Sequence, residues 1–282
     1  MIQETIGLRY RISLSERLLM SAKMVTKGSR VADVGCDHAH TGIWLIKNDI
    51  ASKVIAMDVR KGPLEKAREN IKLYGLDGII ETRLSDGLEK LSVGEADSIV
   101  IAGMGGTLTV EILKNGIDKA AAARELILQP QSDIGMVRRF LGENGFVITQ
   151  EKMCKEDGKF YNSMRAVNVV NIGRVTTEHF FNTMKSQEYS GRITVTDQEL
   201  PENTEPETNH KNPEFLQAIY DEFGEILLKS QNPVLKELLL ILQRKNERNL
   251  KSIEASENEA AMLRKSELEK EKNIIEEALG YY

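Results

Sequence analysis

The sequence contains only two cysteines, Cys36 and Cys154, among 282 residues. Two cysteines do not make a disulfide framework, and no further cysteine is present to complete a cysteine metal cluster. A reducing compartment is the simplest setting for such a chain. We therefore expect a cytoplasmic protein that holds no metal ion.

Long apolar runs are also absent from the sequence. No run approaches the roughly 18 apolar residues that a membrane-spanning helix needs. The N-terminal stretch MIQETIGLRYRISLSERLL lacks the apolar centre of a secretion signal. We expect no membrane partner, and the apolar share of 41% is sufficient for an ordinary globular core.

The net charge of −5 is spread unevenly along the chain. Residues 1–173 carry 24 Lys and Arg against 22 Asp and Glu, whereas residues 213–282 carry 10 against 14. A basic group near the N-terminus comprises Arg9, Arg11, Arg17, Lys23, Lys27 and Arg30. Such a group could attract phosphates even on an acidic protein, but a solvated helix face explains it slightly better without further evidence.

Strand-like and helix-like segments alternate through the first 173 residues. We expect strands at 31–35, 53–58, 79–84, 97–102 and 124–129, and helices at 13–24, 39–47, 63–74, 106–114 and 133–141. Ser13 would cap the first helix, because Glu16 stands at the capping-box spacing. Two last strands, 146–151 and 160–168, are joined too tightly for a crossover helix. The pattern predicts a mostly parallel α/β sheet with an antiparallel hairpin at one edge.

The main candidate site follows the first expected strand, in the run Val31-Ala-Asp-Val-Gly-Cys-Asp-His38. A tight turn between a strand and a helix presents backbone N–H groups to a ligand. Asp33 and Asp37 flank Gly35 and suit hydroxyl and amino groups better than a phosphate. The single glycine does not match the G-x-G-x-x-G signature of dinucleotide sites. From this stretch alone, an ordinary connection with a solvated acidic loop is an equally good interpretation.

Acidic residues after the next two strands extend this candidate site. Asp58 lies 23 residues after Gly35 and is placed to hold the hydroxyls of a ribose, although a charge at a helix N-terminus is the alternative. Asp86 could accept a hydrogen bond from an adenine amine, with Gly87 permitting close approach, or the pair could form a simple turn. Together these residues describe a nucleoside pocket without a phosphate cradle. S-adenosylmethionine, which has adenine, ribose and an amino-acid tail, fits that description.

The stretch Ala102-Gly-Met-Gly-Gly106 is the most unusual in the chain. Its glycines leave the backbone bare and permit close approach of a substrate. We expect Gly103, Met104 and Gly105 to position the methyl acceptor, so that a side chain added at Gly105 would block the acceptor base. The alternative is a tight turn in which Met104 fills the core.

The end of the chain differs in character. Residues 175–211 are polar and are interpreted as a flexible loop or linker. From Pro233 the apolar residues recur at helical spacing, and a second series contains Met262, Leu263, Leu268, Ile275 and Leu279. This pattern predicts a coiled-coil hairpin that turns at residues 256–258. The predicted domains are therefore 1–173, a linker at 174–212, and 213–282.

Basic residues recur on the first helix of this hairpin. Arg244, Arg248 and Lys251 share one face and could follow the phosphates of a nucleic acid. A solvated helix face is at least as good an interpretation, because residues 213–282 are acidic overall.

Five segments carry a resemblance to a known family: DVGCDHAH, AMDV, SDGLE, DSIVIAGMGG and LILQPQ, in this order. They resemble the TrmK family, bacterial methyltransferases that act on N1 of adenine at position 22 of tRNA. Leu14–Leu18, Glu156–Tyr161 and residues 223–235 resemble the family's first helix, late hairpin and the start of its coiled coil. The match covers nearly the whole chain apart from residues near 174–210. The pairing of GCDHA with IAGMGG is much more specific than the D-x-G motif alone.

The resemblance implies a class I, Rossmann-like methyltransferase fold with a seven-stranded sheet and a C-terminal coiled-coil hairpin. It implies S-adenosylmethionine as cofactor and tRNA as partner, and we expect a monomer. The implied cofactor residues are Asp33, Gly35, Asp37, His38, Asp58, Asp86, Gly87, Ala102, Gly103 and Met104. Two positions depart from the family: His40 replaces a more frequent tyrosine, and Gln131 a frequent asparagine. Both bear on how the target base is held.

The chemistry that this resemblance implies needs little from the protein. Adenine N1 has a lone pair and is already a nucleophile, so we expect no essential general base and interpret His38 as a positioning group. An asparagine-proline-proline-tyrosine motif, which grips exocyclic amines, is absent after the fourth strand. Two alternatives stay open: a methyltransferase for a small molecule or protein, and a non-catalytic RNA-binding protein with a relic pocket.

Overall fold

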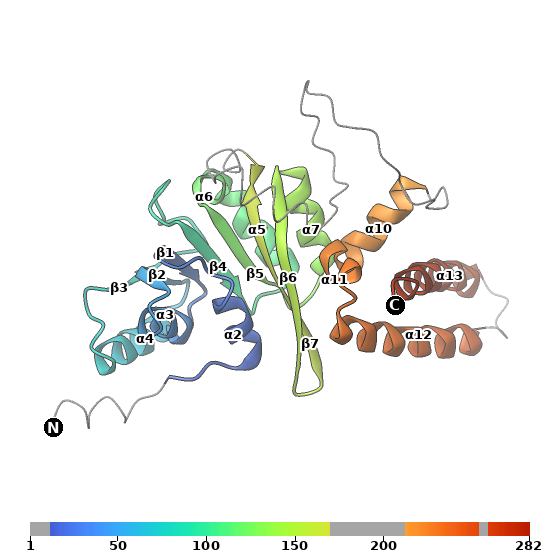
Figure 1. The fold of residues 1–282 in the computed structure, drawn as a ribbon, viewed down its shortest axis with the longest axis horizontal. Helices are drawn as coiled ribbons and strands as arrows, with labels where there is room; N and C mark the ends of the chain where they lie inside the picture. Colours follow the sequence, from blue (N-terminus) through green and yellow to red (C-terminus); the bar gives the residue numbers. More distant parts are fainter. Residues whose placement is uncertain (1–11, 170–211, 254–258) are drawn as a thin grey trace, which may run out of the picture.

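A seven-stranded sheet forms the centre of the computed structural model, which describes residues 12–169, 212–253 and 259–282 (Figure 1). The strands are β1 (Ser29–Val34), β2 (Ala51–Asp58), β3 (Ile80–Leu84), β4 (Ser98–Ala102), β5 (Glu125–Gln129), β6 (Phe146–Glu156) and β7 (Lys159–Asn168). Their order is β3-β2-β1-β4-β5-β7-β6. Strands β1 to β5 are parallel, and β7 runs antiparallel to both β5 and β6. The predicted sheet class and its antiparallel edge hairpin are confirmed.

Helices cover both faces of the sheet. They are α2 (Glu16–Ala22), α3 (His40–Lys47), α4 (Lys61–Leu73), α5 (Gly106–Asn115), α6 (Ile117–Ala122) and α7 (Ile134–Glu143). One apolar core contains residues of α2, α3 and α4, and a second contains residues of α5, α6 and α7. Val31 belongs to the first core and Ala32 to the second, because successive side chains of a strand point to opposite faces. Among the described residues, no helix has an apolar stretch that could span a bilayer.

The first described helix begins later than the sequence predicted. Helix α2 starts at Glu16, so Ser13 does not cap it, and the preceding Ser15 makes no side-chain capping bond. The backbone N–H of Glu16 instead donates to Oε1 of Glu156, at 2.7 Å. Glu156 ends β6, 140 residues further along the chain. A carboxylate at a helix N-terminus accepts a hydrogen bond from a free N–H and interacts favourably with the helix dipole. Because Glu156 comes from a distant strand, no local sequence spacing could predict this cap.

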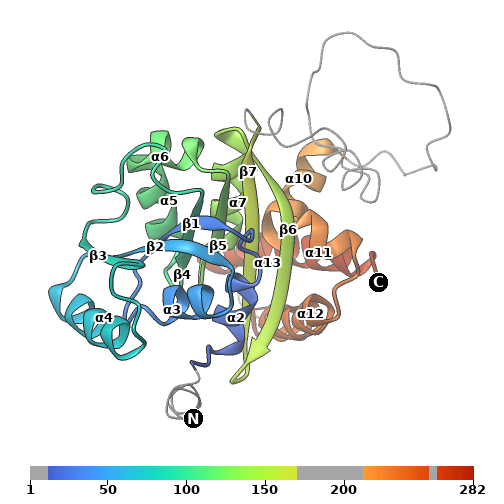
Figure 2. The ribbon, with the colours of Figure 1, turned by 60° about the vertical axis from the view of Figure 1, so that its left-hand side comes forward.

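In the part of the chain that the structure describes after the sheet, the helices are α10 (Pro213–Phe223), α11 (Glu225–Lys229), α12 (Pro233–Ile253) and α13 (Glu259–Leu279). Figures 1 and 2 show them beside β6, at the sheet edge opposite β3. Helices α12 and α13 pair as the predicted hairpin, whereas α6, α10 and α11 were not predicted. The predicted turn at 256–258 and residues 174–211 of the predicted linker lie outside the described residues. The division of the chain into domains stays a prediction.

The seam of the hairpin differs from the predicted apolar series. Leu268 and Ile275 are buried, but Met262 and Leu263 are 66% and 65% exposed, so their place in the seam was predicted wrongly. Asn246 of α12 is buried instead, and its Nδ2 donates to the backbone oxygen of Leu268 at 3.0 Å. A buried amide in a helical seam fixes which residues of the two helices face each other.

The C-terminal helices are attached to the sheet through a buried charge. Arg138 of α7 pairs with Glu151 of β6, with 2.9 Å between Nε and Oε1. Its Nη1 donates to the backbone oxygens of Asp221 and Glu222, at 2.7 and 2.8 Å. These carbonyls belong to the last turn of α10, where a cation is favourable. Burial raises the pKa of the Glu151 carboxyl, and Arg138 opposes that rise.

Replacing Arg138 should therefore destabilise the protein strongly. Arg138→Met leaves the buried Glu151 carboxylate and two carbonyls without their partner, which should lower the free energy of unfolding by about 3–5 kcal/mol. Denaturant titration measures the change. Arg139→Met is the matched control, because this neighbouring side chain is half exposed and its contact with Asp221 is 3.6 Å long. Equal effects of the two substitutions would contradict the assigned role of Arg138.

Candidate active site

A cavity of about 560 Å³ lies at the carboxyl ends of the parallel strands. It is lined by residues from α2, from the turns after β1 to β4, and from α3 and α5. Every residue predicted for cofactor binding lines it: Asp33, Gly35, Asp37, His38, Asp58, Asp86, Gly87, Ala102, Gly103 and Met104. The sequence separates these residues widely, and the shared direction of the parallel strands brings them to one place.

The turn after β1 is built from left-handed residues. Gly35, Asp37 and Ala39 have φ values of +70°, +50° and +59°. Positive φ values turn the backbone sharply within a few residues, and glycine is the residue that adopts them without strain. A Cβ at Gly35 would also collide with the methyl group of Met104. The glycine therefore serves both the turn and the contact with the loop after β4.

Asp33 is the most unusual titratable group in the cavity. The side chain is 4% exposed, and its Oδ2 has no hydrogen-bond partner among the described residues. Burial raises the pKa of Asp33 to about 7; the nearby charge of Asp58 adds to the rise, and a hydrogen bond from the backbone of Gly42 opposes it. A buried oxygen without a partner is costly unless a ligand satisfies it. The site thus offers an acceptor for a donor group, most favourably a cationic one.

Asp58 is equally buried but partly satisfied. Its Oδ1 accepts a hydrogen bond from the backbone N–H of Arg60 at 2.9 Å, just before α4 begins. The carboxylate lines the cavity as well. Asp58 therefore lies at the N-terminus of α4, as the alternative interpretation had it, and it also faces the cavity. Its role as a ligand group stays a prediction.

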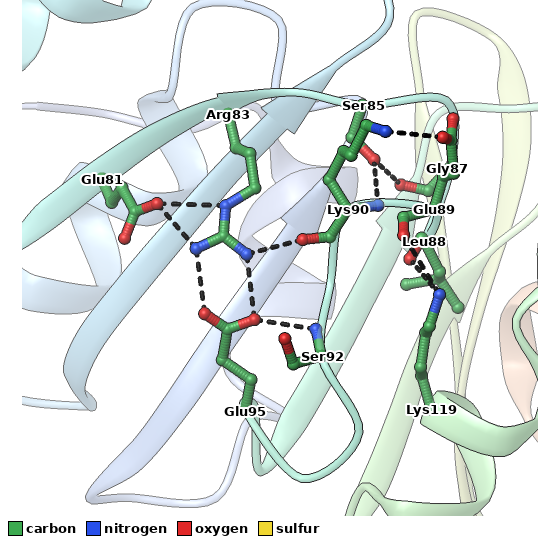
Figure 3. A network of polar contacts seen from close by, with 10 residues as sticks. All are labelled: Glu81, Arg83, Ser85, Gly87, Leu88, Glu89, Lys90, Ser92, Glu95 and Lys119. Atoms are coloured by element: carbon green, nitrogen blue, oxygen red, sulfur yellow. Dashed lines mark hydrogen bonds and ion pairs between the residues drawn. The ribbon is translucent and has the colours of Figure 1, made fainter.

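The loop that carries Asp86 and Gly87 is fixed by a polar network that the sequence analysis missed. Figure 3 shows Arg83 between Glu81 and Glu95, with its Nη1 donating to the backbone oxygen of Lys90 at 2.8 Å. Arg83 holds the pKa of Glu95 down at about 2. The alternation of Glu81 and Arg83 on one strand face was the only local signal of this network.

A second set of contacts fixes the part of the same loop that lines the cavity. Ser85 Oγ donates to the backbone oxygen of Gly87 at 3.0 Å and accepts from the N–H of Lys90 at 3.1 Å. From α6, Lys119 Nζ donates to the backbone oxygens of Leu88 and Glu89, at 3.0 and 3.2 Å (Figure 3). The loop therefore presents Asp86 and Gly87 in a defined position.

The glycines after β4 have different surroundings. Gly103 has φ +84° and lines the cavity, where a Cβ would lie 3.5 Å from the guanidinium of Arg17. Gly105 does not line the cavity, and a Cβ there would lie 3.1 Å from Ser132 Oγ. A Cβ at Gly105 would thus point toward Ser132, which does not line the cavity either, and the effect of a side chain at Gly105 on the acceptor base stays a prediction.

The basic group near the N-terminus is not an open patch where the structure describes it. Arg9 and Arg11 lie outside the described residues. Arg30 pairs with Asp97 at 2.9 Å, and Arg17 points into the cavity, where it contacts Gln129. Arg17 therefore faces the cavity and not an open surface, because tertiary contacts turn the side chain inward. Its role in binding RNA stays a prediction.

The two positions that depart from the TrmK pattern separate in space. His40 lines the cavity and meets His38 edge to face, with ring centroids 5.7 Å apart. Partial burial, and then the proximity of His38, lower the pKa of His40. His38 also lies 3.5 Å from Asp37, between Nε2 and Oδ1. Gln131 is not in the lining and donates its backbone N–H to the oxygen of Met104 at 2.8 Å.

The order of the strands, the glycine turn after β1 and the acidic cavity define a Rossmann-like methyltransferase. The chain belongs to the family described as "Methyltransferase domain", whose profile matches residues 14–164. Among the described residues, no group of three or more His, Cys, Asp or Glu side chains is placed to hold a metal ion.

Within this broad family, the chain is similar to curated proteins and solved structures that are named as tRNA methyltransferases. The tRNA (adenine(22)-N(1))-methyltransferase of Bacillus subtilis is 38% identical over 155 residues, which are 55% of this chain and 65% of that protein. The alignment thus spans slightly less than two thirds of that relative. The solved structure of Bacillus subtilis TrmK is 26% identical, with a TM-score of 0.74, and covers 95% of this chain and 100% of its own. A Streptococcus pneumoniae protein solved in complex with S-adenosyl-L-methionine is 27% identical, with the same coverage and a TM-score of 0.70. The resemblance to the TrmK family is confirmed.

The raised pKa of Asp33 predicts a pH dependence of the ligand-free protein. A carboxyl that is harder to ionise when folded contributes stability below its unfolded pKa of about 4, and loses it as pH rises through about 7. Asp33→Asn should remove this dependence and raise the free energy of unfolding above pH 7 by about 2–4 kcal/mol. Denaturant titrations between pH 4 and 8 measure it. Asp37→Asn, in the same turn but exposed, should leave the dependence unchanged. Parallel profiles for wild type and Asp33→Asn would contradict the assignment.

Proposed function

We propose that this protein transfers a methyl group from S-adenosylmethionine to N1 of adenine 22 in tRNA. The observation that carries the proposal is the convergence of Asp33, Asp58 and Asp86 in one cavity without a phosphate cradle. A cofactor with an ammonium group, ribose hydroxyls and an adenine amine, but no phosphate, satisfies three such carboxylates. The substrate is supported by the names of the relatives, including Bacillus subtilis TrmK.

We assign each end of the cofactor to one part of the cavity. Asp33 would receive the ammonium group, because its buried Oδ2 lacks a partner among the described residues. Asp58 would accept from the ribose hydroxyls, and Asp86 from the adenine amine. Gly35, Asp37 and His38 would surround the amino-acid tail, and Gly87 would let the adenine approach the loop. The Streptococcus pneumoniae relative solved with S-adenosyl-L-methionine supports this cofactor.

The reaction requires placement more than proton transfer. When bound, S-adenosylmethionine supplies a methyl group activated by a sulfonium. Ala102, Gly103 and Met104 form the wall of the cavity where the acceptor base would enter, and the bare backbone of Gly103 leaves room for it. Since adenine N1 has its own lone pair, no residue of this chain needs to act as a general base. The residues must unpair the base, align N1 and exclude water.

Further parts of the chain have roles that follow from a tRNA substrate. Arg244, Arg248 and Lys251 are exposed on α12, where phosphates of the tRNA could reach them. We infer that residues 213–282 form an RNA-holding domain beside the methyltransferase domain. We also infer a cytoplasmic location, since tRNA is modified where it is made. We infer that the protein acts as a monomer.

Methylation of defined tRNA tests the proposed function. Incubation with S-adenosylmethionine and an unmodified tRNA transcript should yield 1-methyladenosine, which mass spectrometry of nucleosides and RNase fragments locates at position 22. A transcript carrying guanosine at position 22 is the control and should gain no methyl group. Methylation of both transcripts at another position would contradict position 22 as the target. Methylation of neither would contradict the proposal and favour a small molecule or protein as substrate, or RNA binding without catalysis.

Asp58→Ala should weaken cofactor binding. The substitution removes hydrogen bonds between a charged acceptor and the ribose, so the binding free energy of S-adenosylmethionine should fall by about 1.5–3 kcal/mol. Titration calorimetry measures the affinity, and a denaturant titration confirms folding. Asp77→Ala, at an exposed aspartate between α4 and β3, is the control and should bind as wild type. An unchanged affinity for Asp58→Ala would remove Asp58 from the site.

A further inference from the structure

Arg17 is the one described basic residue of α2 that lines the cavity. Its Nη1 donates to Oε1 of Gln129 at 3.1 Å, and its Nε lies 4.0 Å from Oε2 of Glu156. The guanidinium stands over the ring of Tyr161, 5.6 Å from the centroid. The side chain is 24% exposed. Three different strands therefore fix the orientation of one guanidinium.

The guanidinium lies at the acceptor end of the cavity. A Cβ at Gly103 would be 3.5 Å from its Nη1, which places Arg17 against the wall assigned to methyl transfer. Gln129 ends β5 and stands opposite Ala102, the last residue of β4. The carboxylates assigned to the ribose and the adenine follow β2 and β3 instead. Arg17 is thus remote in sequence from the cofactor loops but close to the entering base.

The contacts of Arg17 with Gln129 and Glu156 occupy only part of the guanidinium. Arginine has five N–H donors and no acceptor. The contacts to Gln129 and Glu156 use Nη1 and Nε, and Nη2 has no polar partner among the described residues. A guanidinium that lines a cavity with some of its N–H groups unpaired can donate hydrogen bonds to an acceptor atom of a ligand.

We propose that Arg17 donates a hydrogen bond to an acceptor atom of the target nucleotide, and that Gln129 orients it for this contact. The proposal rests on the proposed function. The acceptor must be an edge of the base away from N1, or the phosphate of the same nucleotide, because methylation makes the N1 edge cationic. Glu156 stands beside the guanidinium and moderates the repulsion between Arg17 and the charged product.

Gln129 is a positioning residue in this arrangement. Its side chain is fully buried, and its Nε2 has no hydrogen-bond partner among the described residues. A buried amide group whose N–H has no hydrogen-bond partner lowers the stability of the folded protein. Its Oε1 is the acceptor that holds Nη1, so Gln129→Leu should release the guanidinium whereas Gln129→Glu should keep it in place.

Single-turnover kinetics on the tRNA transcript tests the role of Arg17. Arg17→Ala should lower the methyl-transfer rate about 10- to 100-fold, as expected for losing a hydrogen bond from a charged donor, while calorimetric affinity for S-adenosylmethionine is unchanged. Arg17→Lys should recover part of the rate. Gln129→Leu should reduce the rate in the same direction, and Gln129→Glu should not. Lys72→Ala, at an exposed cation of α4 that does not line the cavity, is the control and should transfer the methyl group as fast as wild type.

Two arms distinguish the base edge from the phosphate. If Arg17 contacts the phosphate, Arg17→Ala should reduce the slope of log affinity for tRNA against log salt by about 1. If it contacts the base, the slope stays the same, and replacing adenine 22 by its 3-deaza or 7-deaza analogue should slow wild type but not Arg17→Ala.

The outcomes separate this proposal from the proposed function. A wild-type protein that transfers no methyl group to tRNA defeats the proposed function, and this inference with it. A wild type that methylates tRNA, with Arg17→Ala equally fast, overturns only the role of Arg17. A parallel loss of cofactor affinity and rate in Arg17→Ala also overturns it, because the residue would then support the cofactor pocket.

Discussion

The position of β1 in the sheet decides where this molecule can hold a ligand. Strand β2 pairs on one side of β1 and β4 on the other, so the connections that leave β1 and β4 diverge toward opposite faces. A crevice must open between them at the carboxyl ends of the strands. Asp33, Asp58 and Gly103 come to the same cavity for this reason, although each belongs to a different strand or turn.

Buried charge has two distinct uses in this protein. Arg138 and Glu151 pair with each other, and the contacts of Arg138 attach the C-terminal helices to the sheet. Asp33 is left with an oxygen that has no partner among the described residues, and its raised pKa expresses that cost. The Arg138–Glu151 pair stabilises the packing of the C-terminal helices on the sheet. The unpartnered oxygen of Asp33 destabilises the ligand-free protein. A ligand that donates a hydrogen bond to Asp33 Oδ2 would relieve this cost.

The sequence predicted the features that depend on local pattern and chain direction. The strands of the parallel sheet, the turn at Gly35 and the acids Asp58 and Asp86 follow from periodicity and from the rule that ligands sit at strand carboxyl ends. The orientation of Arg17, the position of Gly105 and the cap of α2 could not be predicted. Each depends on a contact with a residue far along the chain: Gln129, Ser132 and Glu156. Helix α11 has only 5 residues, too few for a helical repeat to show in the sequence. Met262 and Leu263 fit a helical repeat but are exposed.

The cap on α2 has a consequence for how the chain is made. The helix has 7 residues, too few to persist alone in water. Its N-terminal cap is Glu156, and the hydroxyl of its Ser21 contacts that of Ser163 at 2.7 Å. Both partners emerge from the ribosome long after α2 does. The wall of the cavity that carries Arg17 is therefore completed only when the edge hairpin has been synthesised, after the strands that carry Asp33 and Asp58.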